Sequence, residues 1–230
     1  MGTKKTNAVE AIAIKAPNIQ FGKVYIKGNA PLVIHKFSHK TAMQMMDAQV
    51  AGSTSKTKKN REAMDPDANM NAARHISFEG WDGIPAVAFR AACISACRLV
   101  GYKMTMAKLS IFIDQDGFDS TEGTPLVRIC GPAPRRLDAI VRVGPKKIAC
   151  VCSRPQWLEW GACLRFKYDA DQFTASDIVN LIARAGTQVG VCEGRPDSSN
   201  SVGMGWGTFE ISTEEEIRKL EEKAGKESVK

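Results

Sequence analysis

The strongest chemical pattern in the sequence is a group of cationic side chains in its N-terminal part. Residues 1–61 hold eleven Lys and Arg but only two acids, Glu10 and Asp47. Sequence-independent affinity for nucleic acid comes mainly from such cations, which displace counterions from phosphates. We therefore expect a polyanion partner, although a charged loop that only aids solubility is the alternative. The candidate contacts here are His35, Lys36, His39, Lys40, Lys56, Lys58, Lys59 and Arg61.

A glycine-rich segment, Gly194 to Gly207, is the second candidate binding element. Glycine lets backbone N–H groups approach a phosphate closely. The segment lacks the Lys-Ser/Thr ending of a P-loop, so we do not expect nucleotide hydrolysis. A solvated hairpin tip is the alternative. Arg195 and Trp206 are the two side chains here that we expect to contact nucleic acid.

A third candidate lies on a predicted helix over residues 86–100. Pro85 suits the first turn of a helix, and Gly101 suits its end. Arg90 lies one turn into this helix, near the free N–H groups that attract phosphate. Arg98 lies two turns further on, on the same face. The alternative for both is an ordinary surface arginine.

No catalytic or metal-binding pattern stands out in the sequence. The segment IDQDGFD, with Asp114, Asp116 and Asp119, superficially resembles a calcium loop, but its glycine falls too early and no Glu closes the spacing. We interpret it as a polar turn. The seven cysteines contain no C-x-x-C pair and are interpreted as reduced core thiols. We expect no cofactor, no metal and no catalytic residue.

Composition predicts a folded protein. The chain is 43% hydrophobic and 25% charged, with a net charge of +7. It has no stretch near the roughly 20 apolar residues that a membrane-spanning helix needs, and no N-terminal apolar run of signal-peptide length. We therefore expect a cytoplasmic protein that does not bind membranes.

The predicted elements follow one another as β-α-β-β-α-β once insertions are removed. This is the split βαβ arrangement, in which two helices cover one face of an antiparallel sheet and the open face is the usual binding surface. The predicted strands cover residues 8–16, 23–34, 109–113, 162–168, 188–192 and 207–212. The predicted helices are a short one ending at about Val50, one over 86–100, one from a Thr174–Asp177 capping box to Gly186, and one from a Ser212–Glu215 capping box to about Ala224.

The fold prediction is therefore α+β: a ferredoxin-like or modified RRM antiparallel sheet with helices on one face and an inserted hairpin or thumb. Residues 1–212 form a single core domain, with insertions at about 51–75 and 114–160. Residues 213–230 form a charged C-terminal helix. The segment from Val189 to Ile211 is expected to be a hairpin that completes the sheet.

Three segments, in this order, resemble motifs of a known family. They are Ala30 to His35 (APLVIH), Ile84 to Ala91 (IPAVAFRA), and Val189 to Arg195 (VGVCEGR) with Gly203 to Ile211 (GMGWGTFEI). They resemble, respectively, the end of the first strand, the turn into the first helix, and the glycine-rich loop with its closing strand in the RAMP (repeat-associated mysterious protein) superfamily.

The resemblance is closest to the backbone subunits of CRISPR effector complexes, and the chain is also similar to uncharacterised bacteriophage proteins. Those subunits have a modified RRM core and polymerise along a guide RNA. The family's Lys or Arg at the position matching Arg90 contacts the RNA backbone, so the resemblance implies that role for Arg90. It also implies a bacterial cell or a phage-infected host as the setting.

We therefore expect a non-catalytic protein that binds a single strand, with RNA the first candidate and DNA the second, and that forms a homo-oligomer or filament along it. One alternative is a metal-independent RAMP-type ribonuclease that uses His35 or His39. Another is a phage structural or interaction protein that mimics a CRISPR backbone subunit, with CRISPR-type or phage proteins as partners.

Overall fold

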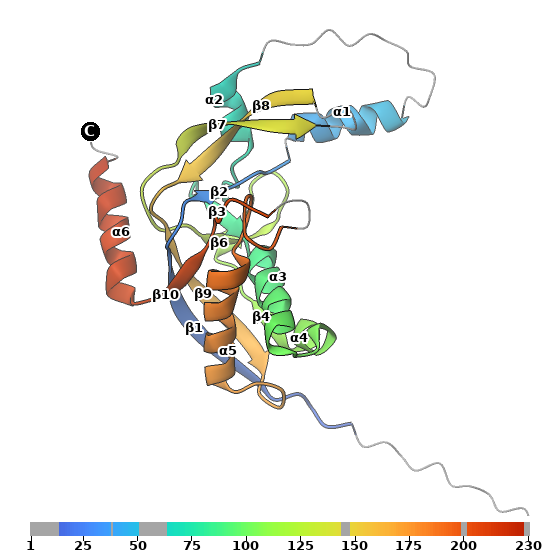
Figure 1. Cartoon of the computed structure of the whole chain (residues 1–230), viewed down its shortest axis with the longest axis vertical. Coiled ribbons are helices and arrows are strands. Elements are labelled where there is room, and N and C mark those ends of the chain that lie inside the picture. The colour runs from blue at the N-terminus through green and yellow to red at the C-terminus, as the bar shows by residue number, and fades with distance from the viewer. Residues whose placement is uncertain (1–13, 38, 51–63, 144–147, 199–201, 228–230) are drawn as a thin grey trace, which may run out of the picture.

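The computed structural model describes residues 14–37, 39–50, 64–143, 148–198 and 202–227 (Figure 1). Four of the predicted cationic contacts, Lys56, Lys58, Lys59 and Arg61, lie outside the described residues. Most of the strand predicted over residues 8–16 also lies outside them. His39 and Lys40 belong to a described helix, but their side chains are outside the description.

A four-stranded antiparallel sheet, with strand order β10-β1-β9-β4, lies at the centre of the molecule (Figure 1). Its strands are β1 (Ile19–Gly28), β4 (Ile111–Ile113), β9 (Gly161–Asp169) and β10 (Phe209–Ser212). Successive side chains of a strand project from opposite faces. Val24 and Ile26 of β1, and Leu164 and Phe166 of β9, are buried on one of these faces. The predicted strand over 162–168 is thereby confirmed as β9.

Two helices share the hydrophobic core with this buried face. They are α3 (Ala86–Ala96) and α5 (Ala175–Arg184). Phe89 of α3 meets Phe209 of β10 edge-on, with ring centroids 5.8 Å apart, and Ile178 and Ile182 of α5 are fully buried. The apolar stripe of each helix therefore fixes it on the core side of the sheet.

Two smaller sheets extend the molecule beyond the central sheet. The first has the order β2-β8-β7 and the second the order β3-β6-β5. Their strands are β2 (Leu32–Val33), β3 (Gly83–Pro85), β5 (Gly117–Phe118), β6 (Pro125–Arg128), β7 (Arg135–Val143) and β8 (Ile148–Trp157). Strands β7 and β8 pair antiparallel from the pair of Arg135 with Gln156 to the pair of Val143 with Ile148, within the region over 114–160 that we interpret as an insertion.

The remaining helical elements lie around these sheets. They are α1 (His39–Val50), α2 (Pro66–Ala72), η1 (Cys97–Val100), α4 (Met104–Ser110), η2 (Ala185–Val189, a π-helical turn) and α6 (Glu214–Glu227). Helix α6 packs through Ile217 and Leu220 in a small cluster with Cys130 and Tyr25, separate from the main core. Within the described residues, no helix is long and apolar enough to cross a membrane.

Local end signals in the sequence predicted several helix boundaries. Thr174 and Asp177 form the predicted capping box at the start of α5. Helix α3 continues as η1 and ends at Gly101, which has the left-handed φ of 69°. The start of α6 is displaced by one residue from the prediction, because Thr213 and Glu216 exchange the capping contacts expected of Ser212 and Glu215.

The prediction that Val189 to Ile211 forms a hairpin is wrong. Among the described residues of this segment, only β10 is a strand, and it pairs with β1. Gly190 (φ 72°) and Cys192 (φ 64°) have positive φ values, which a strand does not allow, so the expected first strand of the hairpin does not form. A backbone hydrogen bond from the Val191 N–H to the Gly207 carbonyl (2.9 Å) brings the two ends of this segment together.

The single strand predicted over residues 23–34 is divided into two strands that lie in different sheets. Strand β1 pairs with β9 and β10, and β2 pairs with β8. The bend at Gly28 separates them. A side chain at Gly28 would collide with the Trp160 indole, 2.0 Å from the Cβ position, so only glycine fits there. Trp160 also donates its indole N–H to the Ala30 carbonyl at 2.9 Å, which holds the bend.

The overall architecture is mixed α and β with antiparallel sheets.

Candidate nucleic-acid interface

A cleft of about 460 Å³ opens where the three predicted motif segments meet. We call it the motif cleft. The segment after β2, the start of α3 and the glycine-rich loop each line it, and a histidine from before β3 completes the wall. Its lining residues are Ile34, His35, His75, Pro85, Val87, Ala88, Cys192, Glu193 and Arg195.

The N-terminus of α3 opens onto the motif cleft. Pro85 precedes the helix, and no side chain caps its first turn. The first N–H groups of a helix have no partner within the helix and carry the positive end of its dipole. Because Val87 and Ala88 line the cleft, this end of α3 favours an anion in the cleft.

Among the described residues that line the cleft, Arg195 is the principal cation. Glu193 is engaged by Arg154, whose Nε donates to its Oε2 at 3.0 Å. His35 Nδ1 lies 4.0 Å from the same oxygen. Burial, and then the charge of Arg154, lower the pKa of His35 despite the opposing effect of Glu193, so its imidazole is mainly neutral at pH 7. Arg195 Nη1 donates to the Cys192 carbonyl at 3.1 Å, which holds it at the cleft wall.

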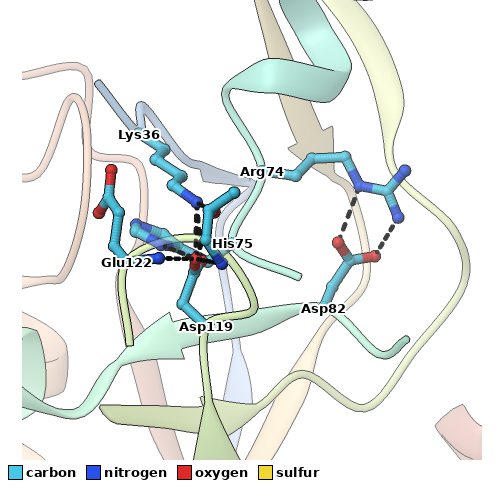
Figure 2. Close-up of polar contacts among 7 residues, drawn as sticks. Lys36, Arg74, His75, Asp82, Asp119 and Glu122 are labelled. Atoms are coloured by element: carbon cyan, nitrogen blue, oxygen red, sulfur yellow. Dashed lines mark hydrogen bonds and ion pairs between the residues drawn. The ribbon is translucent and has the colours of Figure 1, made fainter. Parts of the chain in front are cut away.

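A buried polar cluster supports the floor of this region (Figure 2). Asp119 is fully buried, and both of its oxygens accept from Lys36 Nζ, at 2.7 and 2.9 Å. His75 Nδ1 lies 3.0 Å from Asp119 Oδ2. The backbone N–H groups of Thr121 and Glu122 donate to the other oxygen at 2.9 and 3.0 Å. Burial alone would raise the pKa of Asp119, but these hydrogen bonds outweigh it and hold the pKa well below its usual range.

His75 joins this cluster to the cleft. Burial lowers its pKa more than the hydrogen bond to Asp119 raises it, so the imidazole is neutral at pH 7. A neutral imidazole beside an ionised carboxylate donates from Nδ1, which leaves Nε2 as an acceptor. The neighbouring Arg74 donates to both carboxylate oxygens of Asp82, from Nε at 2.8 Å and from Nη2 at 2.7 Å (Figure 2). This bidentate pair joins the two ends of the segment between Arg74 and Asp82.

The structure places only two of the described candidate contacts on the cleft, His35 and Arg195. Lys36 is buried against Asp119, and this burial argues against direct contact with a polyanion. Arg90 faces away from the cleft, because its Nε donates to the Ile111 carbonyl at 2.9 Å and its guanidinium lies over the Phe112 ring at 4.9 Å. The predicted contact of Arg90 with phosphate at the helix start therefore has no geometric support.

Arg98 and Trp206 shape the glycine-rich loop instead of lining the cleft. Arg98, in η1, pairs with Asp197 at 2.7 Å and so ties that loop to the helix. Trp206 packs on Gly194, where a Cβ would lie 2.5 Å from the indole ring and where φ is 72°. Both residues therefore hold the loop that carries Arg195 in place.

Sequence reasoning missed His75, Glu193 and Arg154. Asp119 was interpreted as part of a polar turn, although it is the centre of the buried cluster. His75 and Asp119 are 44 residues apart, so no spacing pattern in the sequence links them. A lone histidine or a lone carboxylate carries no local signal of such a contact.

The chain matches no protein-family model, and no curated protein sequence matches it. Within the described part of the chain, no group of three or more His, Cys, Asp or Glu side chains is arranged to hold a metal ion. The proposals below therefore depend on the geometry of the cleft and on the motif resemblance.

Replacing Asp119 with asparagine will strongly destabilise the protein. The substitution leaves the Lys36 ammonium buried without its carboxylate, and breaking a buried ion pair in this way costs about 3–5 kcal/mol. Urea unfolding at pH 7 measures the change in the free energy of unfolding. Adding Lys36→Met to Asp119→Asn will recover much of the loss. A cost below about 1 kcal/mol, the range of an exposed pair, would contradict the stabilising role of the cluster.

Acidification will reduce stability in two steps. The folded-state pKa values of His75 and His35 both lie below the ordinary value of 6.5, so the unfolded chain takes up protons at these residues first and stability falls as pH drops below about 6.5. The folded-state pKa of Asp119 is also depressed, so its contribution, complete above its ordinary value of 3.8, is lost as pH falls further. Unfolding titrations from pH 8 to 3 measure both steps. A His75→Asn variant will flatten the step near pH 6, and an unchanged profile would count against the assignment.

Proposed function

We propose that the protein binds single-stranded nucleic acid, RNA in preference to DNA, in the motif cleft, and that it assembles side by side along the strand without catalysing a reaction. The observation that carries the proposal is the meeting of the uncapped start of α3, Arg195 and His35 at one cleft. A phosphate in the cleft accepts hydrogen bonds from helix N–H groups and from the forked guanidinium of Arg195.

The arrangement of the central sheet supports the finer fold assignment. The chain order β1, α3, β4, β9, α5, β10 and the sheet order β10-β1-β9-β4 are those expected of a ferredoxin-like or modified RRM core. The same assignment agrees with the motif resemblance to the RAMP superfamily. Fold alone does not fix function, so the proposal depends on the cleft.

Exposed apolar side chains outside the core support assembly. Met45 and Met46 of α1 are 55% and 58% exposed, and Val50 at its end is 84% exposed. Ile140 and Val151, on the paired strands of the β7–β8 hairpin, are 76% and 46% exposed. Apolar surface of this kind favours contact with another protein surface, and a neighbouring copy on the same strand supplies one.

Arg195→Glu will weaken binding to a fluorescently labelled 30-nucleotide RNA about tenfold at low salt, because it reverses the charge at the phosphate position. The slope of log affinity against log salt will fall by about one, as expected for the loss of a single phosphate contact. Fluorescence anisotropy at several salt concentrations measures both quantities.

Arg184→Glu is the matched control for this experiment. It makes the same charge change on the exposed end of α5, away from the cleft lining, and will alter binding far less. Electron microscopy of the same samples tests assembly, with filaments expected only when a long strand is present. Equal losses in the two variants, or no binding by the native protein at low salt, would overturn the proposal.

The position of His75 favours ribonuclease activity as a second candidate function. His75 and His35 line the same cleft, and Asp119 orients His75 so that Nε2 is the free acceptor. In this reaction Nε2 of His75 takes the proton of a ribose 2′-hydroxyl, whose oxygen attacks the adjacent phosphorus. The bond to the 5′-oxygen breaks, and protonated His35 supplies the proton to that oxygen, leaving a 2′,3′-cyclic phosphate.

Cleavage of labelled RNA in the presence of a chelator tests this candidate. The native protein will produce fragments ending in a cyclic phosphate, with a rate that rises below pH 7 because the depressed pKa of His35 limits its protonated form. His75→Gln will abolish cleavage while RNA binding persists. A substrate with a 2′-deoxy group at the cut site is the control. Intact RNA after long incubation with the native protein removes this candidate and leaves the binding proposal in place.

A further inference from the structure

The face of the central sheet opposite α3 and α5 carries alternating cationic and aromatic side chains. Because Val24 and Ile26 are buried in the core, the odd-numbered residues of β1 project from this other face. On β1 they are Ile19, Phe21, Lys23, Tyr25 and Lys27, so cationic and aromatic side chains alternate from Phe21 onward.

The strand register continues this pattern across the sheet. Phe21 pairs with Lys167 of β9, and Lys167 pairs in turn with Phe112 of β4, so one row of the face reads aromatic, cation, aromatic. Lys167 Nζ lies 5.8 Å from the centroid of the Phe112 ring. Phe21 is 74% exposed and lies near the start of β1, where β1 pairs with β9 and is not covered by β10. Arg165, beside Lys23, is held by Asp116.

Helix α6 covers the other end of this face. Ile217 and Leu220 lie against Gly161 of β9, where a Cβ would be only 2.5 Å from Ile217 Cδ1. The same two side chains form the small cluster with Tyr25 and Cys130. Figure 1 shows α6 across the central sheet from α3. A cluster of this size holds the helix by far fewer apolar contacts than the main core holds α3 or α5.

The first turn of α6 places acids next to the lysines of the face. This turn contains Glu214, Glu215 and Glu216. Lys27 Nζ lies 3.6 Å from Glu216 Oε1. Lys23 Nζ donates to the Tyr25 hydroxyl at 3.2 Å. This hydrogen bond, and then the nearby charge of Glu214, raise the pKa of Lys23. These carboxylates occupy the positions that phosphates of a bound strand would take.

We propose that this sheet face is a second single-strand site, at which bases stack on Phe21 and, once α6 is released, on Tyr25, and that α6 is a removable acidic cover that competes with the strand for Lys23, Lys27 and Tyr25. The inference shares the nucleic-acid partner of the proposed function but uses a different surface. Aromatic rings beside cations match a base followed by its phosphate. Phe112 is already covered by the guanidinium of Arg90, 4.9 Å from its ring centroid. Asp114, 3.9 Å from Lys167, and Asp116 oppose phosphates near β4, so the strand follows the β1 side of the face.

Release of α6 tests the proposal. In the variant Ile217→Asp with Leu220→Asp, binding of a labelled ten-nucleotide oligouridylate will strengthen about tenfold, the gain expected from roughly one additional stacked base. A second variant, Glu214→Gln with Glu216→Gln, keeps the apolar contacts of α6 and removes its acids. It will also strengthen binding, and urea unfolding verifies that the core of each variant is folded.

Tyr25→Ala supplies the decisive control, because Tyr25 is the aromatic side chain of this face that packs against α6, whereas Phe21 is exposed with α6 in place. In the released background Tyr25→Ala will remove the gain in affinity, whereas Arg195→Glu will leave the gain intact, because Arg195 lies in the motif cleft. The experiment therefore distinguishes loss of binding in the motif cleft from loss of binding on this sheet face. Unchanged affinity in both α6 variants, or a gain that survives Tyr25→Ala, would overturn the proposal.

Discussion

The buried carboxylate of Asp119 is the constraint on which the motif cleft depends. Its partners come from three separate parts of the chain: Lys36 follows β2, His75 precedes β3, and the Thr121–Glu122 turn lies between β5 and β6. A buried charge is tolerated only while it is paired and hydrogen-bonded, so none of these segments moves away without a large cost. The cluster thus fixes His35, one residue from Lys36, and His75 as two walls of the cleft.

The sequence predicted the elements whose signals are local, and the distant contacts escaped it. The strand at β9 follows from its alternation, and the start of α5 follows from the Thr174–Asp177 capping box. Lys36 was expected on the surface, because its partner Asp119 lies 83 residues away and no local pattern in the sequence indicates their ion pair. The glycine-rich loop was expected to be a hairpin, since glycine content does not distinguish a strand pair from a closed loop. Only the left-handed backbone of Cys192 and its neighbours separates the two.

The caps of the helices show a contrast that bears on the cleft. Asp65 caps α2 and Thr174 caps α5 with side-chain oxygens, while α3 begins at Pro85 without such a contact. A missing cap typically costs a helix about 1 kcal/mol. In α3, burial of Phe89 and Ile94 in the main core offsets that cost. The free N–H groups of α3 are consequently available at the cleft in a helix that does not need them for its own stability.

The charges of the described cleft limit how salt can act on binding there. Arg195 is its principal cation, His35 is mainly neutral at pH 7, and helix N–H groups carry no counterion to exchange. Binding in the cleft alone therefore gives a shallow dependence on salt. A steep dependence requires several additional cations, and the sequence supplies Lys56, Lys58, Lys59 and Arg61 in the segment that follows α1. The slope thus separates a strand held only in the cleft from one that also contacts cations outside it, such as this basic segment or the lysines of β1, and it does so without any substitution.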